Sequence, residues 1–229
     1  GTPTTLAGYG ITDAGDSPFS YNSNEAGGIE VADYTTASGS RAFAVGNDNL
    51  ASGSSSTAMG RGTIASGNDS TALGANTEAS GIASTALGER TTASGDFSTA
   101  MGRDAVASNQ DSTAMGKGTI ASGVASTAMG FGTIASGDFS TAIGDYTLSS
   151  GDFSTALGKG TIASGGYSTA MGYFTTAEDY MTLALGTLNK ADETPNPDNF
   201  SYQNTAFVIG NGGFNSCLLY TSPSPRDTL

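Results

Sequence analysis

The chain lacks most of the side chains on which enzyme active sites depend. Its 229 residues include no histidine, no tryptophan and a single cysteine, Cys217. Without histidine or a second thiol, no nucleophile can be paired with a base, no Cys or His cluster can hold a transition metal, and no internal disulfide can form. The adjacent carboxylates Glu178 and Asp179 are expected to form a solvated edge rather than an acid–base pair. We therefore expect no enzyme activity, no catalytic or metal-binding residues and no cofactor.

Charge is scarce and largely of one sign. Only 13% of the residues are charged, and 21 acidic against 8 basic residues give a net charge of −13. Such a surface repels phosphate backbones and anionic headgroups, so we expect no nucleic-acid partner. Nowhere do about 18 apolar residues run together, and we expect no direct membrane insertion by this chain.

What the chain does contain is a repeat of fourteen residues. The stretch "STAMGRGTIASGND" (Ser56 to Asp69) is followed at once by "STALGANTEASGIA" (Ser70 to Ala83). One glycine column runs from Gly46 to Gly186, and a second, seven residues out of phase, runs from Gly39 to Gly165 with Asn109 as its one exception. Because asparagine tolerates positive φ better than most residues, this exception predicts left-handed turn positions in the second column. The predicted turn glycines include Gly60, Gly67, Gly74, Gly81, Gly88, Gly95 and Gly102.

Two short segments lie between the turns of each repeat. Segments such as "STAMG" and "TIASG" are too short for helices, and the glycine content excludes a heptad coiled coil. Two strands and two turns per fourteen residues describe one coil of a parallel β-solenoid, with rungs stacked about 4.7 Å apart. The sequence therefore predicts an all-β fold of eleven rungs over residues 31–190, a rod on the order of 50 Å long.

Two further columns predict an interior and an association surface. Alanine fills one column from Ala44 to Ala184, and the next column is apolar throughout. Strand neighbours point to opposite faces, so alanine is expected to line a flat roll while the apolar row lies outside it. An exposed apolar row favours association, and we expect several copies of the chain to bury it around a common axis. This predicted seam comprises Met59, Leu73, Leu87, Met101, Met115, Met129, Ile143, Leu157 and Met171.

Variation is concentrated just after the glycines. Turn residues face solvent and can carry binding specificity, which makes Phe97, Phe139, Phe153 and Tyr167 candidate surface contacts. Stacking between neighbouring rungs explains the same aromatic residues equally well.

Threonine also recurs, in the columns that contain Thr57 and Thr63. β-Branched residues suit strands, and their hydroxyls are expected to bond along a ladder. A regular threonine array that matches an ice lattice is the alternative interpretation.

The pattern "STAMGxGTIASGxxSTALG" resembles the head repeats of YadA-type trimeric autotransporter adhesins. The resemblance covers about residues 31–190 and rests on two phased glycine columns, an alanine column and an apolar column. It implies a left-handed parallel β-roll, three chains to a homotrimer, and an extracellular head that binds a host-surface protein or glycan.

Both ends depart from the repeat. Residues 1–30 are expected to be an N-terminal connector, because "PTTLAGYGITDA" (Pro3 to Ala14) resembles a connector repeat of phage tail fibres. Residues 191–216 are expected to be a cap or transition segment, since "TAFVIGNG" (Thr205 to Gly212) resembles the segment before an intramolecular chaperone in fibre proteins. Residues 217–229 abandon the pattern and are expected to be a non-native or unstructured tail, with the natural C-terminal region missing.

Three functions fit these observations. The first is a surface-exposed fibre or adhesin head that attaches to a host cell, matrix or receptor. The second is a phage tail-fibre shaft without receptor contact, and the third is an ice-binding solenoid. The carrier is expected to be a bacterial surface, with outer-membrane anchoring through a missing region, or a phage virion.

Overall fold

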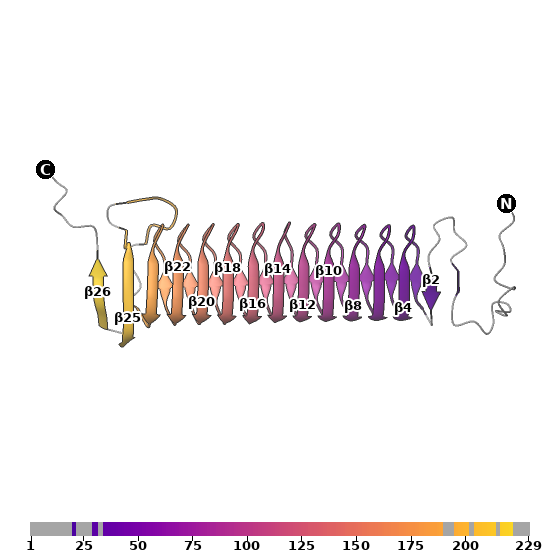
Figure 1. Cartoon of the computed structure of the whole chain (residues 1–229), viewed down its shortest axis with the longest axis horizontal. Helices are drawn as coiled ribbons and strands as arrows, with labels where there is room; N and C mark the ends of the chain where they lie inside the picture. The colour runs from indigo at the N-terminus through magenta and orange to yellow at the C-terminus, as the bar shows by residue number, and fades with distance from the viewer. Residues whose placement is uncertain are drawn as a thin grey trace.

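Strands of two lengths alternate along the chain and stack into two sheets. The computed structural model describes residues 20–21, 29–31, 34–189, 195–201, 204–213 and 216–221. In this part of the chain every helix or strand element is a strand. The longer strands stand side by side in one row and the shorter ones lie behind them, so that the rungs progress from one end of a rod to the other (Figure 1). The predicted all-β parallel solenoid with fourteen-residue coils is confirmed.

One strand of each rung has five residues and belongs to the longer sheet. These strands are β4 (Phe43–Asn47), β6 (Thr57–Arg61), β8 (Thr71–Ala75), β10 (Thr85–Glu89), β12 (Thr99–Arg103), β14 (Thr113–Lys117), β16 (Thr127–Phe131), β18 (Thr141–Asp145), β20 (Thr155–Lys159), β22 (Thr169–Tyr173) and β24 (Leu183–Thr187).

The other strand of each rung has two residues and belongs to an 11-stranded sheet. These strands are β3 (Thr36–Ala37), β5 (Leu50–Ala51), β7 (Ile64–Ala65), β9 (Glu78–Ala79), β11 (Thr92–Ala93), β13 (Val106–Ala107), β15 (Ile120–Ala121), β17 (Ile134–Ala135), β19 (Leu148–Ser149), β21 (Ile162–Ala163) and β23 (Thr176–Ala177).

The rungs pair in parallel and in strict register. β10 pairs with β12 so that Ala86 lies beside Ala100, Leu87 beside Met101 and Gly88 beside Gly102. The same register, an offset of fourteen residues, joins the other long strands from β4 to β24. Each sequence column is therefore a physical column along the rod, as the repeat predicts.

Additional strands extend the longer sheet at both ends. β2 (Ile29–Val31) pairs in parallel with β4 and antiparallel with β1 (Ser20–Tyr21). At the other end β25 (Phe207–Gly213) continues the parallel register of β24, and β26 (Ser216–Thr221) pairs antiparallel with it. The predicted transition segment thus supplies the last parallel strand, and residues 217–221 of the predicted tail belong to β26. The predicted connector at residues 1–30 lies mostly outside the described residues.

Small side chains fill the interior of the roll. Ala58 on a long strand and Ala65 on a short strand are fully buried, as are their counterparts along the rod. Thr63 and Ser56 close the two ends of the same narrow interior. The roll is flat because nothing larger than threonine or asparagine separates its two sheets in the repeat region.

The interior threonine hydroxyls do not form the predicted ladder. Thr63 donates its hydroxyl to Asn49 Oδ1 at 2.6 Å, but the buried Oγ1 atoms of the following threonines have no hydrogen-bond partner: Thr77, Thr91, Thr119, Thr133, Thr147, Thr161 and Thr175. These threonines stack on one another along the rod, and their β-branched side chains fill the interior without a hydroxyl ladder.

The two glycine columns are required by close contact between rungs. A Cβ on Gly88 would lie 1.9 Å from the carbonyl oxygen of Gly102, and a Cβ on Gly95 would lie 1.9 Å from that of Asn109. Each glycine Cα–H therefore points at a carbonyl oxygen of the next rung, a weak hydrogen-bond geometry typical of adjacent strands.

The second glycine column does not have the positive φ that the sequence predicted. Gly88 has φ +125°, but neither Gly95 nor Asn109 is among the residues with positive φ. The left-handed position of that turn falls two residues later, at Phe97 and Asp111. The side chain of Asn109 is itself hydrogen-bonded: its Nδ2 donates to Ser122 O at 3.1 Å and its Oδ1 accepts from the Gln110 N–H at 2.9 Å.

Three glycine-to-alanine substitutions separate the effects of contact and of φ. Gly95→Ala introduces the clash alone and should lower the free energy of unfolding by about 1–3 kcal/mol. Gly88→Ala adds a φ penalty of about 1–2 kcal/mol and should cost the most. Gly118→Ala, at φ +64° with nothing within 4 Å of its Cβ, should cost only about 1 kcal/mol. Guanidinium unfolding of the three variants checks this order, and a loss for Gly118→Ala equal to that for Gly88→Ala would contradict it.

Candidate adhesive surface

Each rung presents two outer sheet faces and two edges to its surroundings. The long-strand face carries the apolar column of β6, β8 and the other long strands. The short-strand face carries the outward-pointing residues of β7, β9 and the other short strands. We call the two residues after each glycine of the first column, which are the last residue of the long strand and the first of the turn, the mixed edge (residues 61–62, 75–76, 89–90, 103–104, 117–118, 131–132, 145–146, 159–160 and 173–174). We call the turns after the second column the acidic edge (residues 68–69, 82–83, 96–97, 110–111, 124–125, 138–139, 152–153 and 166–167).

The predicted seam lies on the outer side of the long-strand face. Met59 is 39% exposed, Ile143 and Met171 are similarly exposed, and the remaining residues of the row are half-buried. The neighbouring alanines are fully buried within the same strands. A single chain therefore leaves a continuous apolar row against solvent from β4 to β24.

A second apolar stripe lies on the short-strand face, and the sequence analysis did not identify it. Ile64, Ile120 and Ile162 are each 37% exposed on this face. Unlike the seam, the stripe is interrupted, because Glu78 and Thr92 occupy the same column. The sequence signal was present, as apolar residues that recur every fourteen positions, but the glycine and alanine columns on either side were more regular.

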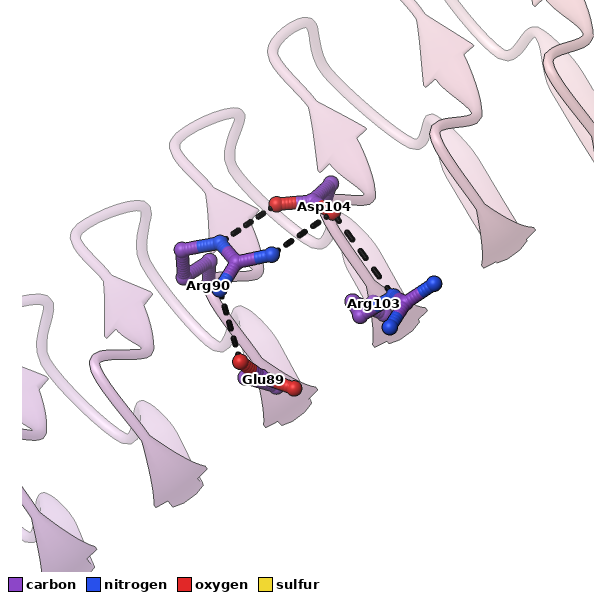
Figure 2. A network of polar contacts seen from close by, with 4 residues as sticks. All are labelled: Glu89, Arg90, Arg103 and Asp104. Carbon is purple, nitrogen blue, oxygen red and sulfur yellow. Dashed lines mark hydrogen bonds and ion pairs between the residues drawn. The ribbon is translucent and has the colours of Figure 1, made fainter.

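Charged residues of the mixed edge pair with one another across rungs. Figure 2 shows Arg90 between Glu89 and Asp104: its Nε and Nη2 lie 2.6 and 3.0 Å from the two Asp104 carboxylate oxygens, and its Nη1 lies 2.6 Å from Glu89 Oε1. The hydrogen bond from Arg90 lowers the pKa of Asp104 below its ordinary value and raises the pKa of Arg90 itself. Stability from a lowered carboxylate pKa is present above the ordinary pKa and lost as the pH falls, and exposed pairs contribute little of it.

Further pairs extend this pattern along the mixed edge. Lys159 Nζ lies 3.1 Å from Asp145 Oδ2, and this hydrogen bond raises the pKa of Lys159. Lys117 lies over the ring of Phe131 at 5.1 Å, and Phe131 meets Tyr146 edge to face at 5.0 Å. Many charged and aromatic side chains of this edge therefore contact the neighbouring rung.

Three aspartates of the acidic edge accept hydrogen bonds from backbone N–H groups rather than from basic side chains. Asp96 Oδ1 accepts from the Ile82 N–H at 2.8 Å, Asp138 Oδ1 from the Val124 N–H at 2.8 Å, and Asp152 Oδ1 from the Asp138 N–H at 3.0 Å. Among the described residues no ion pair involves an aspartate of this edge. These carboxylates are held in place and keep their charge uncompensated.

Three of the four candidate contact residues form one aromatic ladder on the acidic edge. The rings of Phe139 and Phe153 stack at 4.9 Å with 8° between their planes, and those of Phe153 and Tyr167 at 4.8 Å and 7°. Phe97 stands apart, because the equivalent residues of its neighbouring rungs are Ala83 and Asp111. It is 58% exposed, more than any of the other three.

The ice-lattice interpretation requires two exposed threonine columns, and neither column is fully exposed. Thr63 and its counterparts are buried inside the roll. Thr57 and its counterparts are half-buried on the long-strand face, beside the apolar row. A flat, exposed, two-column threonine array is therefore not formed.

Asp179 is buried, so the prediction that Glu178 and Asp179 form a solvated edge is wrong for Asp179. The side chain is 2% exposed. Its Oδ1 accepts from the Asn196 N–H at 2.6 Å and its Oδ2 from the Thr205 N–H at 2.8 Å. A carboxylate in the second glycine column thus fixes the segment that leads from the last rung to β25. The sequence could not show this, because both donors belong to backbone far along the chain.

Nothing in the described part of the chain gathers three or more histidine, cysteine, aspartate or glutamate side chains into a possible metal site. No helix in the described ranges is long and apolar enough to cross a membrane. A filled interior of small residues with repeated exposed columns is the organisation of a structural solenoid.

The YadA head domain repeat matches the chain over residues 51–77, 79–105, 93–119, 107–133, 121–147, 149–175 and 163–189. These segments cover more than half of the chain and fall within the solenoid. The chain therefore belongs to the YadA head domain family. No curated protein matches it at a significant level.

The stabilising effect of the aromatic ladder is testable by comparing Phe153→Gly with Phe97→Gly. Both residues have left-handed φ, +57° and +58°, so both substitutions relieve the same backbone strain. Phe153 also loses two stacked partners, each contributing about 0.5–1.5 kcal/mol. Phe153→Gly should therefore be less stable than Phe97→Gly by about 1–3 kcal/mol in thermal or guanidinium unfolding. Equal stability of the two variants would show that the stacking has no energetic role.

Proposed function

We propose that the chain is the head segment of a trimeric surface adhesin, which attaches its carrier to a host cell, matrix or receptor. The observation that carries the proposal is the in-register YadA head solenoid, in which the glycine, alanine and apolar columns of the long strands recur while the turn residues vary from rung to rung. The chain acts by binding rather than catalysis, outside the cell, on a bacterial surface or a phage fibre.

Assembly supplies the missing cover for the apolar row. A row of valine, methionine, leucine and isoleucine that is unbroken from β4 to β24 is best buried against identical rows. The stripe on the short-strand face is less suited to this role, since Glu78 would be buried there without a partner. We therefore place the seam, and not the isoleucine stripe, at the threefold axis.

Three chains around one axis would display three copies of each edge along the rod. Weak sites repeated in this way raise apparent affinity by avidity, by about 10²-fold or more, without any strong single site. The acidic edge is the better candidate for contact, because its carboxylates remain uncompensated and its aromatic residues are about half-exposed. Phe97, Phe139, Phe153 and Tyr167 are the proposed contact residues.

The seam is tested by placing aspartates on each of the two sheet faces in turn. Met101→Asp with Met115→Asp should dissociate the trimer, since a buried aspartate on each of three chains has no partner. Ile120→Asp alters an apolar residue of the short-strand face that is more exposed than the half-buried Met101 and Met115 and should leave the trimer intact. Sedimentation equilibrium of the parent and both variants measures the effect. A parent chain that sediments as a stable monomer would overturn the proposed assembly.

Attachment is tested by changing Phe97, Phe139, Phe153 and Tyr167 together to serine in the trimeric protein. Retention on target cells or matrix should fall at least about tenfold, since avidity multiplies the loss at each site. Tyr146→Ser with Phe174→Ser, on the mixed edge, is the matched control and should retain binding. Unchanged retention would exclude these residues as the contact, and no retention by the parent would favour the structural shaft.

A further inference from the structure

A cleft of about 470 Å³ lies at the C-terminal end of the acidic edge. Its walls include the ladder residues Phe153 and Tyr167 together with Tyr180, Asp152 and Asp198. This volume is within the range of small-ligand sites. The repeat alone does not form it, because one wall belongs to the segment 195–201, which follows the last rung.

Backbone hydrogen bonds hold the wall of the cleft against the rungs. The Gly166 N–H donates to Pro197 O at 2.8 Å, and the Tyr180 N–H donates to Asn196 O at 3.0 Å. The buried carboxylate of Asp179 accepts from the Asn196 N–H. The cleft is thus a built feature of the cap.

Aromatic rings form a corner on one side of the cleft. Tyr167 stacks on Phe153, and Tyr180 meets Tyr167 at 5.4 Å with 68° between their planes. The stacked neighbours occupy each other's faces, whereas the tilted ring of Tyr180 ends the ladder at the cleft. Ring faces attract cations through their quadrupole, and tyrosine is among the better partners.

The charge of the cleft is negative and uncompensated. No lysine or arginine lines it. Asp152 is oriented by the Asp138 N–H, and its other oxygen has no partner among the described residues. Lys159, at the end of β20, lies on the opposite, mixed edge, where it pairs with Asp145. Carboxylates beside aromatic rings stabilise an organic cation, repel phosphate or sulfate, and give a neutral sugar no electrostatic advantage.

We propose that this cleft binds the ammonium group of a lysine side chain on a basic segment of the host-surface partner. The inference deepens the proposed function and rests on it, because it names the chemistry of the partner that the adhesin meets. The carboxylates of Asp152 and Asp198 bind the ammonium group, and Tyr180 with Tyr167 covers its alkyl chain.

The test uses the full chain and the tripeptide acetyl-Gly-Lys-Gly-amide, whose single charge limits non-specific attraction. Its Nε-acetylated form is the matched probe, which keeps the alkyl chain and loses the charge. Titration followed by NMR should show saturable binding of the first peptide only, weakened at least about twofold by 0.5 M salt. Asp152→Asn and Asp198→Asn should each raise its Kd about 2- to 5-fold, and Tyr180→Leu by a similar factor.

Asp69→Asn and Asp111→Asn are control variants on the same edge, outside the cleft. They should leave the Kd unchanged, and an equal weakening by them would mean general electrostatic attraction and overturn the site. Choline and methyl glucoside are the two competing probes. Binding of choline without the lysine peptide would assign the cleft to a lipid headgroup, and binding of the sugar alone would assign it to a glycan; either result overturns the proposal.

The cell-retention assay separates this inference from the proposed function. Asp152→Asn with Asp198→Asn should reduce retention of the trimer as well as peptide binding. Retention on cells without any peptide binding would overturn the lysine site but not the proposed adhesin function. Peptide binding without retention of the parent would leave an ammonium site on a chain that is not an adhesin head.

Discussion

The close contact between a glycine Cα and the carbonyl oxygen of the next rung is the constraint on which the rest of the structure depends. A Cβ added to a glycine of either column would lie within about 2 Å of that oxygen, and the second column holds larger residues at Asn109 and Asp179, whose side chains are hydrogen-bonded. Glycine stacked on glycine in register is therefore the rule along the rod, and every other position is carried into register with it. The turns, the flat interior and the exposed columns all follow from this spacing.

A flat interior limits what the chain can bury by itself. Alanine, serine and threonine remove little apolar surface from water. The stability of the rod therefore depends on the hydrogen bonds and the packing between adjacent rungs. Larger apolar residues such as Met101 and Ile120 are displaced to the outer faces. The same geometry that makes the roll thin thus creates its apolar stripes, and the stripe without a charged interruption is the one suited to a threefold seam.

The two edges differ because their charges are used differently. On the mixed edge Arg90 and Lys159 are paired with carboxylates of neighbouring residues and rungs. On the acidic edge Asp138 and Asp152 are held by backbone N–H groups and remain without basic partners. One edge of the fold therefore reinforces the rod through ion pairs, whereas the other carries carboxylates and aromatic rings that have no basic partner among the described residues.

The sequence alone determined the period, the two strands per rung, the buried alanine column and the outward apolar row, because each depends on contacts between identical positions fourteen residues apart. It misjudged Asn109, since a column conserved for close approach looks the same in sequence as one conserved for positive φ. It could not show the burial of Asp179, nor the cleft beside Tyr180. Both are created where segment 195–201 folds back on the last rungs, and contacts between a repeat and a unique segment leave no periodic signal. Only the tertiary structure decided those features.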